Sequence, residues 1–250
     1  MKVYFVGGGP GDPKLLTVRA KELLENCKCC VYAGSLVSDE VLALIPAEAE
    51  KYDSAEMDLA QTVAVAVKCA AKNVDMVRLH SGDPSIFGAI REQMNELDSH
   101  GIAYEVVPGV SSFQAAAAAL NLELTAPEVA QAVILARTAG RTPVPDEQGI
   151  DELGRTRSTL CLFLSVGDLE NTATRLSIHY GEDCPAAVVS RASWPDQMIL
   201  TGTLADIAGK TKDAGIKKTA MVIVGWALSR DIPASRLYAS DFSHGYRQAR

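Results

Sequence analysis

The chain of 250 residues lacks an apolar segment as long as a membrane-spanning helix requires. Its longest apolar stretch with helical character, residues 115–122, is much too short. Met1 and Lys2 lead directly into a predicted strand, without the apolar core and cleavage site of a secretory signal. These absences predict a cytoplasmic protein that makes no use of a membrane.

An excess of basic residues is also absent. The formal net charge is −7, from 24 Lys and Arg against 31 Asp and Glu. Proteins that bind nucleic acid through its phosphates need a basic surface, so we expect no nucleic-acid partner. A small anionic substrate stays compatible with this charge, because a local group of arginines can lie on an acidic protein.

Few cysteines or histidines have the spacing that metal ligands require. Cys27 and Cys30 have CxxC spacing, but no second pair of Cys or His follows at the distance typical of a zinc finger. The six cysteines are therefore interpreted as buried, reduced thiols, since free cysteine is among the most buried residue types. No metal site is expected.

Two similar corners are present in the N-terminal half. The predicted strand at residues 3–6 leads into Gly7-Gly-Gly-Pro-Gly-Asp-Pro13, and the strand at 74–79 leads into Ser81-Gly-Asp-Pro84. Asp12 and Asp83 are suitable helix N-caps, and a proline follows each at the first helical position. A helix is expected from Pro84 to about Leu97. Two such corners predict loops that meet at one end of a parallel sheet, where open α/β sheets bind their ligands.

Strands alternate with helices through this half, which predicts parallel βαβ units. The shorter spacing of the later strands permits antiparallel pairing. We expect two α/β domains, residues 1–115 with a mostly parallel sheet and residues 116–250 with a mixed sheet, and a ligand cleft between them. The expected strands are 3–6, 29–32, 75–79, 103–107, 133–136, 159–164, 186–190, 199–202 and 220–224. The expected helices are 15–24, 39–44, 59–73, 84–97, 115–119, 168–180 and 204–214.

The glycine-rich corner is a poor dinucleotide site. A G-x-G-x-x-G pattern starting at Gly7 would require glycine at position 12, where Asp12 stands instead. That carboxylate would repel a pyrophosphate at the helix N-terminus. No Gly-Lys-Ser/Thr follows as in a Walker A loop, and no Gly-x-Ser-x-Gly elbow of a serine hydrolase exists.

The polar residues at these corners have two interpretations. Asp12 and Asp83 can be simple caps, each worth about 1 kcal/mol. Alternatively, Gly82, Asp83, Ser111 and Ser112, which all follow predicted parallel strands, hold an amino-acid-like or ribose-like group. His80 is interpreted as a hydrogen-bonded structural residue. A group of arginines further along belongs either to a solvated loop or to a carboxylate-binding site; it comprises Arg137, Arg141, Arg155 and Arg157.

Taken in order, several motifs resemble the tetrapyrrole methylase family, the class III S-adenosylmethionine-dependent methyltransferases, over nearly the whole chain. They are Val-Gly-Gly-Gly-Pro-Gly-Asp-Pro (6–13), Leu-Leu-Thr (15–17), Gly-Asp-Pro (82–84), Pro-Gly-Val-Ser-Ser (108–112), Arg-Ala-Ser-Trp-Pro-Asp-Gln (191–197) and Gly-Thr-Leu (202–204). Each motif alone is weak, and their order along the chain makes the resemblance specific.

Within the family, four stretches resemble the members of the cobalamin pathway that methylate carbon 11 of precorrin-4 or its cobalt complex. They are residues 32–37, 78–90, 137–145 and 192–195. The resemblance implies a two-domain homodimer that binds a small tetrapyrrole and S-adenosylmethionine, with S-adenosylhomocysteine as product. Open alternatives are a sister enzyme acting on uroporphyrinogen, another precorrin, a diphthine precursor or ribosomal RNA, and a nucleotide-binding α/β module.

The resemblance also implies roles for individual residues. The donor would contact Pro10, Gly82, Asp83, Ile86, Ser111, Ser112, Leu164 and Ala192. Leu164 stands where some relatives have Met. Arg137 and Arg141 would bind substrate carboxylates, while Asp12 and Glu128 would face ring nitrogens or assist proton loss as catalytic residues. In-line methyl transfer from a sulfonium needs little acid–base chemistry, so the site would act mainly through proximity and orientation.

Overall fold

The computed structural model describes residues 1–140, 142–235, 239–243 and 245–248. The chain forms two compact units: a first unit of Met1–Ala119 and Arg191–Met198, and a second unit of Leu120–Ser190 and Ile199–Arg250. The expected boundary between residues 115 and 116 falls inside helix α5 (Ser112–Ala119). Within the described residues, none of the helices has the length and apolar character needed to cross a membrane.

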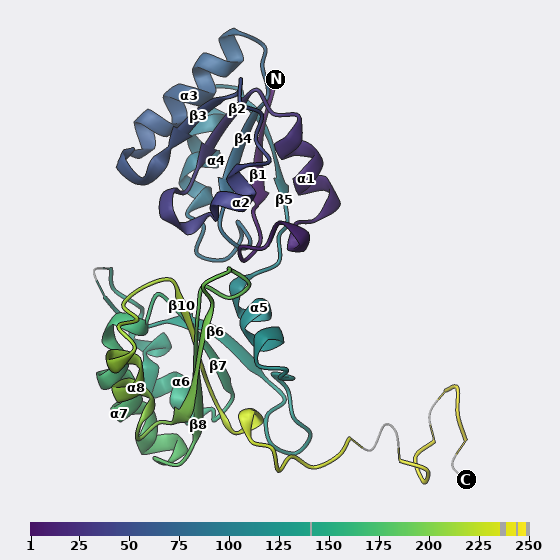
Figure 1. Cartoon of the computed structure of the whole chain (residues 1–250), viewed down its shortest axis with the longest axis vertical. Coiled ribbons are helices and arrows are strands. Elements are labelled where there is room, and N and C mark those ends of the chain that lie inside the picture. The colour runs from purple at the N-terminus through teal and green to yellow at the C-terminus, as the bar shows by residue number, and fades with distance from the viewer. Residues whose placement is uncertain (141, 236–238, 244, 249–250) are drawn as a thin grey trace. The chain divides into compact units, whose positions relative to one another are not determined.

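The first unit is built on a parallel sheet of five strands in the order β3-β2-β4-β1-β5. These strands are β1 (Lys2–Gly7), β2 (Cys29–Tyr32), β3 (Glu50–Asp53), β4 (Met76–His80) and β5 (Ala103–Val107). Helices α1 (Val18–Glu25) and α2 (Asp39–Leu42) pack on one face, and α3 (Leu59–Ala71) and α4 (Ile90–Ser99) pack on the other (Figure 1). The predicted parallel βαβ arrangement is confirmed.

The inner strands are mainly apolar on both faces, as a sheet covered by helices on both sides requires. Val3 and Phe5 face the cluster under α3 and α4, whereas Val6 and Leu79 face the cluster under α1 and α2. Helices α1, α2 and α3 begin at capping residues that the sequence offers. Asp58 and Gln61 form a capping box at the start of α3.

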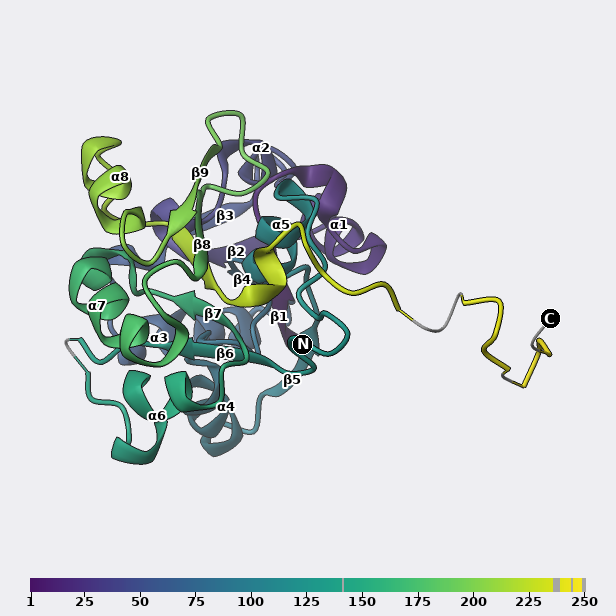
Figure 2. The same ribbon diagram turned by 90° about the horizontal axis from the view of Figure 1, so that it is seen from below.

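The second unit has a mixed sheet in the order β6-β7-β10-β8-β9. Its strands are β6 (Val133–Arg137), β7 (Thr159–Phe163), β8 (Pro185–Ser190), β9 (Met198–Thr203) and β10 (Ala220–Val224). β6 and β7 are parallel, while β10 runs antiparallel to both β7 and β8. Helices α6 (Ile150–Arg155), α7 (Leu169–Tyr180) and α8 (Ile207–Asp213) cover one face (Figures 1 and 2). The predicted mixed sheet is confirmed.

Short 3-10 turns complete the described elements, and several of them follow the strand ends. They are η1 (Pro13–Leu15), η2 (Gly34–Leu36), η3 (Ser54–Glu56), η4 (Asp146–Gln148), η5 (Val166–Asp168) and η6 (Trp226–Leu228).

The helix expected from Pro84 was placed too early. α4 begins at Ile90, after a turn in which Phe87 and Ala89 adopt left-handed φ angles of 54° and 49°. Left-handed residues cannot continue a right-handed helix, so Pro84 lies in a turn. Asp83 still accepts a hydrogen bond from the backbone of Ser85, two residues on, but it caps this turn and not α4.

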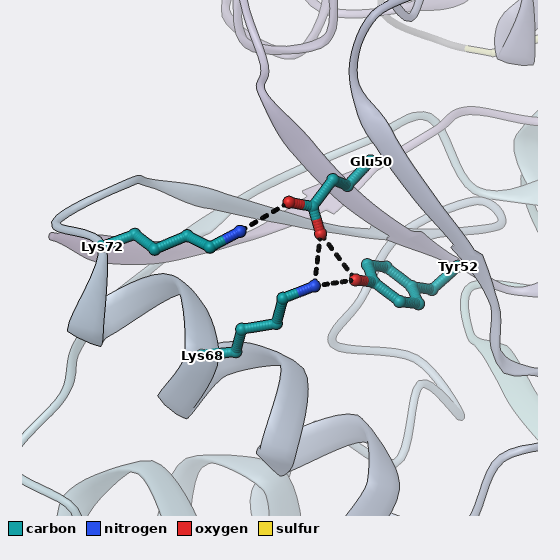
Figure 3. Close-up of polar contacts among 4 residues, drawn as sticks. All are labelled: Glu50, Tyr52, Lys68 and Lys72. Atoms are coloured by element: carbon teal, nitrogen blue, oxygen red, sulfur yellow. Dashed lines mark hydrogen bonds and ion pairs between the residues drawn. The ribbon is translucent and has the colours of Figure 1, made fainter.

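Two elements were not predicted, strand β3 and helix α6. β3 lies at the edge of the first sheet, and its polar residues form a charged network with α3 (Figure 3). The Glu50 carboxylate accepts hydrogen bonds from Lys68 at 2.7 Å, Lys72 at 2.8 Å and the Tyr52 hydroxyl at 2.6 Å. The two lysines and the tyrosine hold the pKa of Glu50 down to about 2. Charged side chains on an edge strand discourage pairing with another chain.

Candidate ligand-binding site

The two similar corners are hydrogen-bonded to each other. The Gly82 amide donates to the Gly9 carbonyl at 2.7 Å, and the Gly9 amide donates to the Gly82 carbonyl at 3.2 Å. The Gly8 amide donates to the carbonyl of His80 at 2.7 Å. Gly9 and Gly82 both have left-handed φ angles, +67° and +64°, which glycine adopts without strain. The predicted meeting of the two loops at one end of the sheet is confirmed.

A third strand end joins them at Gly109, after β5. A Cβ atom added to Gly7 would lie 2.5 Å from the Gly109 nitrogen and 2.7 Å from the Gly82 carbonyl oxygen. No side chain fits between these backbones. The ends of β1, β4 and β5 therefore form one surface made mainly of peptide groups.

Asp83 connects two parts of this surface. One carboxylate oxygen accepts from the Gly109 amide at 2.9 Å, and the other accepts from the amide and the hydroxyl of Ser85. Burial alone would raise the pKa of Asp83, but these hydrogen bonds, led by the Ser85 hydroxyl, hold the pKa below its ordinary value. A carboxylate has about four lone-pair positions, so roughly one stays available to a ligand.

Ser111 and Ser112 begin α5 beside Gly82. The Ser111 amide donates to the Gln114 side chain at 3.0 Å, and Ser111 itself is buried. A Cβ atom on Gly82 would lie in ordinary contact, 3.6 Å, with the backbones of both serines, so Gly82 packs closely against the start of α5. Within the described residues, neither serine hydroxyl has a recorded hydrogen bond. Free hydroxyls, peptide groups and a carboxylate fit the ribose or amino-acid part of a donor such as S-adenosylmethionine.

The segment at residues 191–198, part of the first unit, encloses the glycine-rich corner. The Trp194 indole donates to the Pro10 carbonyl at 2.7 Å, and the Asp12 amide donates to the Ser193 hydroxyl at 3.0 Å. The Arg191 guanidinium lies 5.3 Å from the centre of the Trp194 ring. Ala192 is buried next to these residues. Sequence reasoning assigned only Ala192 to the site, although the Ala-Ser-Trp-Pro motif already marked Trp194.

Of the remaining predicted residues in the first unit, Ile86 is half-buried in the turn after Asp83, and its amide donates to the Asp83 carbonyl at 3.3 Å. Asp12 is half-buried, and its carboxylate accepts from the Lys14 amide at 2.8 Å. The first unit thus brings together every predicted residue that it contains: Pro10, Asp12, Gly82, Asp83, Ile86, Ser111, Ser112 and Ala192.

The buried side chains of Arg78 and His80 lie on β4, shortly before the corner at Gly82. The Arg78 guanidinium donates to the Gln93 side chain at 3.0 Å and to the Val31 carbonyl at 3.3 Å, both neutral acceptors, and burial lowers its pKa. His80 is 5% exposed, and burial together with the charge of Arg78 lowers its pKa to about 3. The expectation of a hydrogen-bonded histidine is wrong for Nε2, which has no partner in the described structure.

In the second unit, Arg137 and Leu164 lie at the same end of two parallel strands, where Arg137 pairs in register with Phe163. The Arg137 guanidinium donates to the carbonyls of Thr142 at 3.1 Å and Pro143 at 2.7 Å, among others, so it organises its own loop. Leu164 has a left-handed φ of 54° and is 75% exposed. Arg141 lies outside the described residues.

Glu128 is not grouped with Arg137 and Leu164. It is exposed, with a left-handed φ of 61°, in a turn closed by hydrogen bonds between Ala126 and Ala130. This turn precedes β6, whereas Arg137 ends that strand. The described part of the chain also contains no group of three or more His, Cys, Asp or Glu side chains that could hold a metal ion.

Comparisons with known proteins find relatives over almost the whole chain. The model of the family described as Tetrapyrrole (Corrin/Porphyrin) Methylases matches residues 2–208. A cobalt-precorrin-4 C(11)-methyltransferase of Methanocaldococcus jannaschii is 47% identical, with 99% of this chain and 96% of that protein covered. A precorrin-4 C(11)-methyltransferase of Sinorhizobium sp. is 44% identical, with 99% and 98% covered.

Solved structures show the same fold. A cobalt precorrin-4 methyltransferase superposes with a TM-score of 0.89 at 41% identity, covering 91% of this chain and 96% of that one. A uroporphyrin-III C-methyltransferase of Thermus thermophilus, complexed with S-adenosylhomocysteine, gives a TM-score of 0.77 at 30% identity, covering 91% and 99%. With a family model matching most of its length and relatives of this identity over almost all of it, the chain belongs to the tetrapyrrole methylase family.

Proposed function

We propose that this chain transfers the methyl group of S-adenosylmethionine to carbon 11 of precorrin-4 or cobalt-precorrin-4, a step of cobalamin biosynthesis. The observation that carries the proposal is the bridged pair of corners at Gly9 and Gly82, with Asp83 and the free serine hydroxyls beside it. Two relatives that are 47% and 44% identical to this chain are named for methylation of this substrate.

The donor is proposed to bind the first unit at the corner after β4. Gly82 has no side chain that would cover the corner, and Asp83 has about one lone pair left to accept from a hydroxyl or ammonium group. The hydroxyls of Ser111 and Ser112 are proposed to add polar contacts, and Pro10, Ile86 and Ala192 stay predicted contacts of the donor. Leu164, in the second unit, stays a predicted apolar contact of the donor, and the expected cleft between the domains also stays a prediction.

The macrocycle carries carboxylates, which guanidinium groups bind well. Arg137 uses about three of its five N–H donors on its own loop, so about two remain for a substrate carboxylate. Arg141 is proposed for the same task. Asp12 and Glu128 remain the proposed partners of ring nitrogens or of the proton that is lost.

The chemistry needs little from the protein beyond orientation. A sulfonium methyl group is a strong electrophile, and an electron-rich carbon of the reduced macrocycle attacks it in line while the thioether leaves. The rigid peptide surface at Gly7, Gly82 and Gly109 suits this task, since it fixes the position of the donor without a catalytic acid–base pair.

Incubation of the purified chain with an isotopically labelled methyl donor and either precorrin-4 or its cobalt complex tests the proposal. Product NMR should place the label on carbon 11. Methylation of uroporphyrinogen or of another precorrin in its place would assign the chain to a sister activity, and absence of transfer to all of them would refute the proposal. Comparing the two forms of the substrate decides whether cobalt is required.

Donor binding is tested separately by calorimetry with S-adenosylhomocysteine. Loss of one hydrogen bond to a charged group in Asp83→Ala should weaken binding by roughly 10–100-fold. Unchanged affinity in the folded variant would remove Asp83 from the donor site. Tighter binding of nucleotides than of S-adenosylhomocysteine would favour the nucleotide-binding alternative. The proposal includes a cytoplasmic location and a homodimer, and light scattering of the purified chain tests the homodimer.

A further inference from the structure

Two pairs of thiols flank strand β2 near its N-terminal end. Cys29 and Cys30 are neighbours on the strand, so their side chains point to opposite faces. Cys30 shares the cluster under α1 and α2 with Cys27, and Cys29 shares the cluster under α3 and α4 with Cys69. Cys30 lies near enough to Cys27 to lower its pKa, and Cys69 lies near enough to Cys29 to raise its pKa. All four cysteines are buried and free, as the sequence predicted.

The two pairs differ in access. Cys27 lies between the end of α1 and the start of β2, and it borders two surface hollows of about 560 and 510 Å³. It is 8% exposed, whereas Cys30 is fully buried. A small reagent that enters from either hollow therefore reaches the Cys27 sulfur before that of Cys30. Cys29 and Cys69 border one of these hollows, and they are 2% and 4% exposed.

The pairs also differ in ionisation. The interaction with the Cys30 thiol lowers the pKa of Cys27, with help from a backbone hydrogen bond and from the charge of Lys51, against the effect of burial. The pKa of Cys30 rises because Cys27 keeps it protonated and burial disfavours its charge. Burial and the Cys69 thiol raise the pKa of Cys29. The thiolate is the reactive form of cysteine, so Cys27 is the better nucleophile and Cys30 the proton-bearing partner.

We propose that Cys27 and Cys30 form an oxidisable dithiol that hydrogen peroxide converts to an intramolecular disulfide, with Cys27 as the attacking sulfur and Cys30 as the resolving one. The Cys27 thiolate attacks one peroxide oxygen, the O–O bond breaks, and hydroxide leaves, giving a sulfenic acid at Cys27. The Cys30 sulfur then attacks the Cys27 sulfur and expels the sulfenic oxygen as water. In sum, two thiols and one peroxide give one disulfide and two waters.

This modification site is distinct from the ligand-binding site. Cys27 precedes the N-terminal end of β2, whereas Gly9 and Gly82 follow the C-terminal ends of β1 and β4, which run parallel to β2 through the sheet. Oxidation is therefore expected to leave the affinity for S-adenosylhomocysteine unchanged. The proposal does not depend on the proposed function.

The test uses the reduced full-length chain, exposed to hydrogen peroxide, then denatured and alkylated with N-ethylmaleimide. We expect one disulfide per chain and an intact mass lower by about 2 Da before alkylation. Trypsin cleaves after Lys28, so the disulfide should link peptide 22–28 to peptide 29–51. Because the second peptide holds both Cys29 and Cys30, the Cys29→Ala variant should retain the link and Cys30→Ser should lose it.

Matched variants separate the two pairs. Cys69→Ala should form the disulfide as the unsubstituted chain does, and Cys27→Ser should not. Cys30→Ser should instead accumulate a sulfenic acid at Cys27 that dimedone traps, which shows that this sulfur reacts even when no disulfide can form. A chain that stays fully reduced, a disulfide between Cys29 and Cys69 that forms first, or disulfide formation in Cys27→Ser would each overturn the proposal. Circular dichroism of each variant confirms that it is folded.

Discussion

His80 should make the stability of the first unit depend on pH. Its pKa is about 3 in the folded chain against an ordinary value of 6.5. Above pH 6.5 the imidazole is neutral in both states, so it contributes no pH dependence. Below that value the unfolded chain takes up a proton that the folded chain refuses, and stability falls by about 1.4 kcal/mol per pH unit until the folded pKa is reached. At pH 5 the expected loss is about 2 kcal/mol.

Urea unfolding between pH 5 and 7.5 measures this dependence. The sequence has two tryptophans, so a Trp226→Phe background leaves Trp194, in the first unit, as the fluorescent reporter. His80→Leu should remove the decline in stability below pH 6.5, because no neutral imidazole remains to be protonated. His100→Gln, at the exposed end of α4, should keep the decline. An equal decline in His80→Leu and the unsubstituted chain would refute the assignment of this pH dependence to His80.

Three further predictions concern the same unit. Gly82→Ala should lower the free energy of unfolding by about 1–2 kcal/mol, through its left-handed φ alone. Gly7→Ala should lower it by about 3 kcal/mol or more, because the new Cβ overlaps the Gly109 backbone. Chemical denaturation measures both, and equal losses would contradict the packing of the strand ends. Trp194→Phe should lose about 1 kcal/mol with its hydrogen bond to the Pro10 carbonyl, and an unchanged urea midpoint would show that this contact is not stabilising. NMR titration should find the pKa of Glu50 near 2. Lys68→Met should raise this pKa, because the Lys68 hydrogen bond is the largest cause of its shift. The stabilising effect of the network is present above pH 4.5 and is lost as the pH falls toward 2.

The strong local patterns predicted most of the fold. β1, β4 and β5 are mainly apolar segments that end in glycine or proline corners, and a parallel arrangement follows from the helices between them. β3 and α6 were missed because they are short and polar, so no apolar periodicity marks them. Asp83 and Pro84 are compatible with both a helix start and a turn. The left-handed residues Phe87 and Ala89, which decide between the two, depend on packing that the local sequence does not contain.

The site was predictable only where its residues lie on the corners themselves. Gly82 and Asp83 follow β4, and Ser111 and Ser112 follow β5; both are parallel strands that the sequence predicted, and β1 lies between them in the sheet. The contact between Trp194 and Pro10 joins residues 184 positions apart, and no local pattern encodes such a pair. The sequence also did not predict that Arg137 binds the carbonyls of its own loop, because these hydrogen bonds depend on the path of that loop.

The first unit is assembled from two separate segments of the chain, and this affects its folding during synthesis on the ribosome. Its continuous part ends at Ala119, but the segment that carries Trp194 and Ser193 is made only after much of the second unit. At roughly 5–20 residues per second, the first unit waits roughly 4–15 s for its last piece. During that interval the carbonyl of Pro10 and the amide of Asp12 lack their partners. A nascent chain stalled before residue 191 should therefore hold a glycine-rich loop that is still open to proteases, which the completed polypeptide protects.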